Sequence, residues 1–205
     1  MKILITSGPT REYLDPIRFL SNDSSGKMGQ ALAQAALDRG FQVVLVTGPV
    51  VLDYPQATEV HRILTTAEMQ DACLHLFPEC DGVIGAAAPC DYRPAFFSEK
   101  KLSKSTFDGH LELVKTPDVL ASLGKIKQPG QRIVAFALET DDSHNRAMQK
   151  LREKNADCII LNDPKVIGTD ETRIEILYAN GFISERIQGK KINVARKILD
   201  AYALL

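Results

Sequence analysis

The sequence predicts one α/β domain over residues 1–205, built on a doubly wound, Rossmann-like and mainly parallel sheet. Short β-branched runs alternate along the chain with longer segments in which apolar residues recur at helical spacing. Some short runs, such as Val43–Val46, are apolar throughout, which is typical of parallel strands covered on both faces. With 205 residues, 44% hydrophobic and 25% charged, the chain has the length and composition of a single globular domain.

The predicted elements begin with a strand over Lys2–Thr6, a long loop and a helix over Gly29–Arg39. Gly40 would end that helix, because glycine takes a positive φ without a Cβ penalty. A strand over Gln42–Thr47 completes a βαβ unit. Further strands are predicted over residues 59–64, 82–86, 132–137, 158–161 and 173–178, the last as part of a C-terminal strand extension, and further helices over 66–76, 117–122, 143–154 and 193–204. The polar stretch over residues 100–109 predicts a mobile basic loop.

Charge and cysteine content exclude several classes of protein. The 25 Lys and Arg balance 26 Asp and Glu, so no overall field recruits nucleic acid or an anionic membrane. The four cysteines lack both zinc-site spacing and the density of a secreted scaffold, and the four histidines fit no metal motif. The N-terminal apolar run stops at Gly8, too early for a signal segment. We therefore expect a cytoplasmic protein without a metal site of its own.

In an open α/β sheet, ligands bind beyond the carboxyl ends of the strands, so the loops there are the places to look for a site. Three loops qualify: residues 7–28, 87–105 and 137–142.

The first loop ends in a candidate anion cradle. Residues 22–29, NDSSGKMG, place small hydroxyls, a glycine and backbone N–H groups at the positive end of a helix dipole. An ordinary N-cap would use the same residue types. Gly8 and Thr10, just after the first strand, would let a ligand approach the same crevice. The cradle candidates are Ser24, Ser25, Gly26, Lys27 and Met28.

Two further residues of this loop have a functional and a structural interpretation each. The fork of Arg18 suits a phosphate or carboxylate, but Asp15 is close enough in sequence to pair with it. Asn22 could direct its amide at a reacting carbonyl or fix the turn.

The second loop combines an acidic residue with a lysine cluster. Lys100, Lys101 and Lys104 suit a polyphosphate whose charge moves during a reaction, although a solvated surface loop has the same composition. Asp91 follows a run of small residues that includes Ala87, where a base or ribose could lie against backbone, or it caps a turn.

Two remaining residues have a simple structural interpretation. Cys90 has no histidine near it in sequence, which favours a small hydrophobe over a nucleophile. Phe136 is most simply a core residue in an apolar strand.

Several segments taken together resemble one enzyme family, the phosphopantothenoylcysteine synthetases, which are phosphopantothenate–cysteine ligases of coenzyme A biosynthesis. They are ILITSGPTRE, LDPIRFLSNDSSGKMGQALAQAALDRG, VVLVTGPV, GAAAPCDYRPA, KKLSK, LELVKTPDVLASLG, VAFALET and KNADCIILND, which together cover nearly the whole chain. The run from Arg18 to Gly29 is the most specific. In many bacteria this domain follows a flavin-binding decarboxylase, and a chain that starts at the first strand is expected to be a free-standing ligase.

The resemblance implies a two-step, CTP-dependent reaction. The carboxylate of 4′-phosphopantothenate forms an acyl-cytidylate and releases pyrophosphate; cysteine then forms the amide and releases CMP. The resemblance associates Asn22 with holding the acyl-cytidylate and assigns Lys101 and Lys104 to the triphosphate. Together with the charges of the loops, this leads us to expect Arg18, Asn22 and Lys100 at the substrate. Phosphate chemistry leads us to expect Mg²⁺, without an evident protein ligand. The resemblance also implies a homodimer, for which residues 173–187 are the expected pairing surface. The resemblance and the loop composition together predict these nucleotide-binding residues: Gly8, Thr10, Ser24, Ser25, Gly26, Lys27, Met28, Ala87, Asp91 and Phe136.

Two departures from the family pattern leave alternatives open. The basic loop commonly reads KxKK, but residues 101–104 read KLSK, and Pro89-Cys90 precede Asp91 in place of the usual residues. The choice between CTP and ATP therefore stays open, as does a nucleotide-binding regulatory module without turnover. An NAD(P)-dependent oxidoreductase would also suit a βαβ start, but Thr47-Gly48-Pro49 stands where an acidic residue would bind the ribose.

Overall fold

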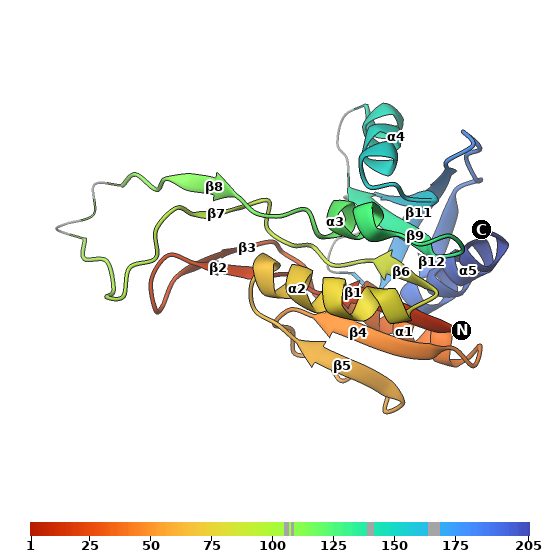
Figure 1. Ribbon diagram of the computed structural model, residues 1–205, viewed down its shortest axis with the longest axis horizontal. Helices are drawn as coiled ribbons and strands as arrows, with labels where there is room; N and C mark the ends of the chain where they lie inside the picture. The colour runs from red at the N-terminus through yellow and green to blue at the C-terminus, as the bar shows by residue number, and fades with distance from the viewer. Residues whose placement is uncertain (105–106, 108, 139–141, 164–168) are drawn as a thin grey trace.

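The computed structural model describes residues 1–104, 107, 109–138, 142–163 and 169–205. Within these residues the main sheet has eight strands (Figure 1). In spatial order they are β12 (Ile187–Lys190), β11 (Glu171–Tyr178), β10 (Cys158–Asn162), β9 (Arg132–Leu138), β6 (Gly82–Gly85), β1 (Lys2–Ser7), β4 (Gln42–Thr47) and β5 (Thr58–Arg62).

The topology confirms the predicted doubly wound sheet. From β5 to β10 all neighbouring strands are parallel, while β11 and β12 add an antiparallel extension. The chain leaves β1 towards β4 and β5 and then returns to β6 on the other side of β1. The switch point of the sheet, where ligands bind in this class of fold, therefore lies between β1 and β6.

Helices cover both faces of the sheet. Because side chains alternate along a strand, Ile3 and Ile5 of β1 enter one core and Leu4 enters the other. The first core packs under α1 (Lys27–Leu37) and α5 (Lys191–Leu204), and the second under α2 (Thr66–Leu76), α3 (Val119–Ile126) and α4 (Ser143–Glu153). None of the helices in the described part of the chain is long and apolar enough to cross a membrane.

Two short hairpins form an arm that projects from one end of the sheet (Figure 1). The first pairs β2 (Arg11–Tyr13) with β3 (Phe19–Ser21), and the second pairs β7 (Tyr92–Pro94) with β8 (Leu113–Lys115). The sequence predicted loops here. The basic loop, residues 100–109, lies between β7 and β8; residues 105, 106 and 108 of it fall outside the described residues. Residues 139–141 of the third predicted loop also fall outside them.

Candidate active site

Two adjacent hollows lie beyond the carboxyl ends of β1, β6 and β9. Their volumes are about 490 and 500 Å³, and both are lined by Ala87, Asp91, Phe136 and Lys150. The cradle residues from Asn22 to Met28 line the second hollow. The sequence therefore assembles parts of all three strand-end regions around two adjacent hollows, as the switch-point rule requires.

The start of α1 forms the floor of the second hollow. Gly26 is its N-cap at φ +74°, and no side chain caps the first turn. The structure therefore lacks the ordinary N-cap, a Ser or Asn side chain bonded to the first turn, that the sequence offered as an alternative. Ser7 donates a hydrogen bond from Oγ to the Gly26 carbonyl at 3.1 Å, which fixes the turn to β1. The first backbone N–H groups of the helix are thus presented to the hollow, where an anion can accept from them.

Two ammonium groups lie beside this cradle. Lys27 Nζ contacts Asp170 Oδ1 at 2.6 Å, and this hydrogen bond lowers the pKa of Asp170. Lys191 also lines the hollow, and its Nζ donates to the carbonyls of Thr169 and Glu171. Burial, together with the neighbouring charge of Lys27, lowers the pKa of Lys191. Two ammonium groups therefore lie close to the helix start, one of them paired with Asp170.

Asn22 lies where the first hairpin meets the loop after β6. Its Nδ2 donates to the carbonyls of Ala88 at 3.2 Å and Pro89 at 2.9 Å. Because both partners can only accept, the amide nitrogen must face the loop, and Oδ1 is left as the acceptor of this side chain. Asn22 thus fixes the loop and offers an acceptor, whereas the sequence analysis considered only a donor or a turn residue.

Three residues predicted at the nucleotide line both hollows. The backbone N–H of Ala87 donates to Thr6 Oγ1 at 3.2 Å, which holds this residue at the end of β1. The small side chain of Ala87 borders both hollows. Asp91 is exposed there, and its carbonyl accepts from the Thr116 N–H at 3.0 Å. Phe136 packs partly against the first core and also lines the hollows, so its core and ligand interpretations are compatible.

Gly8 and Thr10 support the site from behind. Gly8 has φ +71°, and its carbonyl accepts from the Ala88 N–H at 2.9 Å. Thr10 is fully buried, and its hydroxyl pairs with the hydroxyl of Thr66 at 2.8 Å. Neither residue lines the two hollows.

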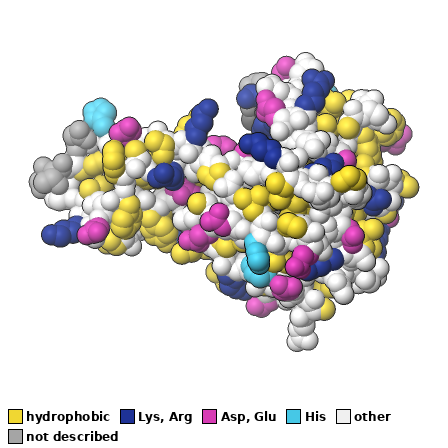
Figure 2. Space-filling view, in the orientation of Figure 1, with side chains coloured by type: hydrophobic (Ala, Val, Ile, Leu, Met, Phe, Trp, Pro, Cys, Tyr) yellow, Lys and Arg dark blue, Asp and Glu magenta, His cyan; other side chains and the backbone are white. Residues whose placement is uncertain are grey.

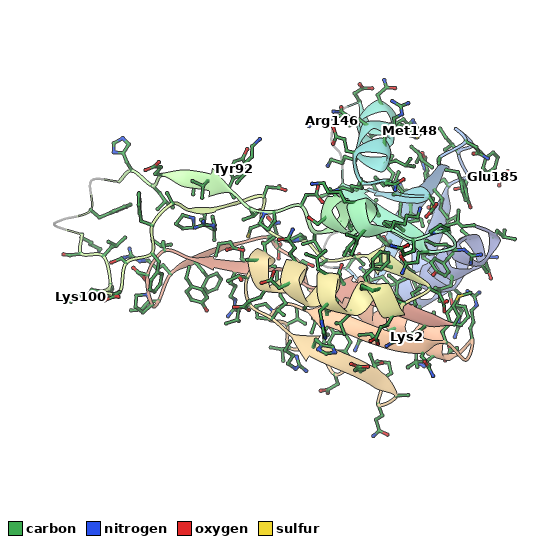
Figure 3. All side chains as sticks on the ribbon, viewed as in Figure 1. Lys2, Tyr92, Lys100, Arg146, Met148 and Glu185 are labelled. Atoms are coloured by element: carbon green, nitrogen blue, oxygen red, sulfur yellow. The ribbon has the colours of Figure 1, made fainter. Side chains whose placement is uncertain are left out.

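The predicted basic loop lies apart from the hollows. Lys100 is near the far end of the arm (Figure 3), and neither it nor Lys101 and Lys104 lines the described hollows. Arg18 also lies on the arm, where its guanidinium pairs with Asp15 and donates to the Leu102 carbonyl at 2.9 Å. The structure therefore contains the Arg18–Asp15 pair that the sequence offered as an alternative. This pair holds the basic loop through the Leu102 carbonyl.

Sequence reasoning missed the lysines of α4. Lys150 lines both hollows and Lys154 lines the first, where its Nζ contacts Asp118 at 2.5 Å. Their spacing of four residues places them on one face of a helix, which was the available signal. Burial alone would raise the pKa of Asp118, but the hydrogen bond from Lys154 lowers it.

Two further observations concern cysteine and metal-binding side chains. Cys90 is buried, and burial raises the pKa of its thiol, so it matches the small hydrophobe predicted from the sequence. Among the residues that the structure describes, no group of three His, Cys, Asp or Glu side chains could hold a metal ion.

Comparison with known proteins places the chain in a family. Residues 1–204 match the family model described as DNA/pantothenate metabolism flavoprotein C-terminal domain. The chain is 39% identical over 208 residues to the coenzyme A biosynthesis bifunctional protein CoaBC of Bacillus subtilis, a match that covers 99% of this chain and 51% of that protein. The chain thus spans about half the length of this curated relative.

Solved structures agree with this match. A crystal structure of the C-terminal domain of CoaBC is 36% identical, with a TM-score of 0.83 and coverage of 99% of this chain and 94% of that one. A Cab2 variant in complex with phosphopantothenate-cysteine is 17% identical, with a TM-score of 0.77 over 98% of this chain and 86% of that one, and shares the fold. The resemblance inferred from the sequence is confirmed: the chain belongs to the DNA/pantothenate metabolism flavoprotein C-terminal domain family, that of the phosphopantothenoylcysteine synthetase domains of CoaBC-like proteins.

Proposed function

We propose that this chain is a phosphopantothenate–cysteine ligase of coenzyme A biosynthesis that activates its acid with CTP. The observation that carries the proposal is the gathering of the α1 cradle, Asn22 and Asp91 around one space at the switch point of a sheet of this family. Two adjacent hollows of similar volume, which share four lining residues, suit a nucleotide next to an acid.

In the first step, a carboxylate oxygen of 4′-phosphopantothenate attacks the α-phosphorus of CTP. The new P–O bond replaces the bond to pyrophosphate, which leaves with its electron pair. The two reactants are both anions, so donors must offset their repulsion before they can meet in line. The N–H groups of the α1 start and the ammonium groups of Lys27 and Lys150 are placed to do so.

In the second step, the cysteine amine attacks the acyl carbon of the acyl-cytidylate. The C–N bond forms, the C–O bond to CMP breaks, and the nitrogen loses a proton to solvent or phosphate. Asn22 is suited to this step because its amide nitrogen is held by the carbonyls of Ala88 and Pro89. Its Oδ1 can then accept a hydrogen bond from the incoming amine and hold it against the acyl group.

Mg²⁺ enters this scheme as a complex with the nucleotide. The described residues hold no cluster of three metal-binding side chains, and Mg²⁺ commonly takes its ligands from phosphate oxygens and water.

We further propose a homodimer. In the surface expected at residues 173–187, both edges of β11 are paired, with β10 and β12, while Phe182 and Ile183 stay exposed. The arm also exposes large apolar side chains, among them Phe96 and Phe97, and we propose it as the interface. Burying these against a second copy would also bring the basic loop of one subunit within reach of the other subunit, where Lys101 and Lys104 could contact the triphosphate.

A cytoplasmic location remains our prediction. All four cysteines are free thiols in the fold, which suits a reducing compartment.

A direct assay tests the function. Purified protein with phosphopantothenate, CTP, Mg²⁺ and cysteine should release CMP and pyrophosphate in equal amounts with the amide product. Without cysteine, pyrophosphate release should stop at about one per site. Release of neither CMP nor pyrophosphate would refute the proposal. If the protein binds CTP tightly but does not convert it, the regulatory module would be favoured. Parallel reactions with ATP measure the nucleotide preference, and a spectral titration with NADH tests for an oxidoreductase.

A further inference from the structure

Beside the first hollow, a buried ring of hydrogen bonds holds the backbone N–H and the carbonyl of a single residue, Cys90. The Cys90 N–H donates to Thr10 Oγ1 at 2.9 Å, Thr10 and Thr66 share a hydroxyl–hydroxyl bond of 2.8 Å, and Thr66 Oγ1 donates to the Cys90 carbonyl at 3.3 Å. Since each hydroxyl has one proton, this fixes the direction: Thr10 donates to Thr66. Both hydroxyls then donate once and accept once, and the ring closes on Cys90.

The three residues of the ring are buried. Thr10 and Thr66 are fully buried, and Cys90 is 7% exposed. Thr66 begins α2, where its N–H donates to the buried carboxylate of Glu12 at 2.8 Å. Buried hydrogen bonds of this kind are costly to break, because a buried polar group that loses its partner cannot form a hydrogen bond with water instead. The ring therefore ties the start of α2 to the loop after β6.

Cys90, the residue held by the ring, lies between two parts of the proposed active site. The carbonyls of Ala88 and Pro89, just before Cys90, accept from Asn22. Asp91, just after it, lines both hollows. A shift of Cys90 would consequently displace the two carbonyls that orient Asn22.

The geometry points to Thr66 as a positioning residue for amide formation, acting through Thr10, Cys90 and the loop carbonyls on Asn22. Thr66 does not line the second hollow, where the cradle lies. This inference rests on the proposed function, in which Asn22 serves the second step.

The test compares Thr66→Val with Thr66→Ser in single-turnover reactions with CTP labelled at the α-phosphate. Valine keeps the shape of threonine but removes the hydroxyl, so the ring opens. We expect Thr66→Val to slow the cysteine-dependent decay of acyl-cytidylate about tenfold, as for one lost hydrogen bond, while pyrophosphate release stays within about twofold. Thr66→Ser should restore the second step to within about twofold of the original protein.

A matched control is available on β5. The buried hydroxyl of Thr58 has no hydrogen-bond partner within the described residues, so Thr58→Val makes the same chemical change without opening a ring. It should leave both steps within about twofold. If Thr66→Val does not fold, Thr116→Val serves instead, because Thr116 donates a second hydrogen bond to the Cys90 carbonyl.

A double variant separates positioning from general weakening. The Asn22→Ala/Thr66→Val double variant should carry out the second step less than about twofold more slowly than Asn22→Ala alone, since the effect of Thr66 passes through Asn22. Equal slowing of both steps by Thr66→Val, an unchanged second step, no recovery in Thr66→Ser, or full additivity with Asn22→Ala would each overturn the inference. An unmodified protein that makes no pyrophosphate would instead refute the proposed function.

Discussion

Asp15 shows how one buried residue can anchor a distant loop. Its carboxylate is fully buried and accepts from the backbone N–H groups of Ile17 and Arg18 and from the Arg18 guanidinium. It also accepts from the Leu102 N–H at 3.2 Å, on the other hairpin. The bend of the first hairpin thus holds the backbone of the basic loop.

This arrangement predicts a pH-dependent stability. Burial alone would raise the pKa of Asp15, but the hydrogen bonds from Arg18 and the backbone N–H groups outweigh it and lower the pKa. A carboxyl whose pKa is lower in the folded than in the unfolded protein stabilises the fold at pH values above its unfolded pKa, which is near 4. This contribution is lost as the pH falls through the lowered pKa of the folded protein.

Asp15→Asn should therefore lower Tm by about 5 °C at pH 7, and the difference should shrink steadily below about pH 4. Differential scanning calorimetry at several pH values measures it. Replacing the exposed Asp53 by asparagine is the control, with no comparable change expected. A Tm difference that is constant from pH 2 to pH 7 would contradict the assignment.

A second prediction concerns the lysines of the basic loop. If Lys101 contacts the triphosphate during the reaction, Lys101→Ala should slow pyrophosphate release about 100-fold, as when one stabilising donor is removed from a transition state. Ser103→Ala should change this rate much less, because a neutral hydroxyl offsets no charge. Rapid-quench measurement of pyrophosphate compares the two, and similar losses in both variants would show that the loop has another role.

At the scale of elements, most of the sheet could be predicted because its strands and helices have clear periodicities. The strand over Gln42–Thr47 and the helix over Thr66–Leu76 have the predicted bounds. The hairpins of the arm were missed because strands of three residues, such as Arg11–Tyr13, are too short for alternation to be seen. Their pairing depends instead on contacts such as that of Tyr13 with Phe19 across the hairpin.

The candidate site was predictable only in part, for a similar reason. The cradle could be found because its residues are contiguous and precede a helix. The ring around Cys90 joins residues up to 80 positions apart, and buried hydroxyls give no local signal. Lys150 lies on α4, and only the packing of that helix against the sheet brings it to the hollows.

The packing of α1 on β1 supplies an element-scale prediction. A Cβ added to Gly29 would lie 2.2 Å from Ser7 Oγ, so any larger residue must push the helix and its cradle away from the strand. Gly29→Ala should lower the free energy of unfolding by about 1–3 kcal/mol, as for overpacking, and weaken nucleotide binding. Urea unfolding and CTP titration measure the two effects.

Controls for this variant come from the same helix. Gln34 is exposed on α1, so Gln34→Ala should change the free energy of unfolding by no more than about 0.5 kcal/mol. Adding Ser7→Gly to Gly29→Ala removes the colliding atoms and should make the double variant more stable than additivity predicts. Strict additivity would contradict the proposed collision.

At the scale of the whole molecule, the arm is the feature that a single compact subunit leaves unexplained. Figure 2 shows hydrophobic side chains along it, away from the main body. Phe96 and Phe97 are 78% and 57% exposed, and with Ile17 they form a set of large apolar side chains that one subunit does not bury. Exposed apolar surface of this kind marks interaction sites.

The arm therefore predicts where the proposed homodimer forms. Phe96→Asp should shift the protein towards monomer, because burying a phenylalanine side chain contributes about 1.5–3 kcal/mol per subunit, whereas an aspartate would have to lose its hydration. Phe182 is similarly exposed, at 62%, but lies in the β11–β12 connection, so Phe182→Asp should leave the dimer intact. Light scattering coupled to gel filtration gives the mass of each variant over a range of concentrations. A monomer from Phe182→Asp and a dimer from Phe96→Asp would return the interface to residues 173–187.

If the arm forms the interface and the basic loop acts across it, Phe96→Asp should also lose ligase activity in proportion to its loss of dimer, and raising the protein concentration should restore both together.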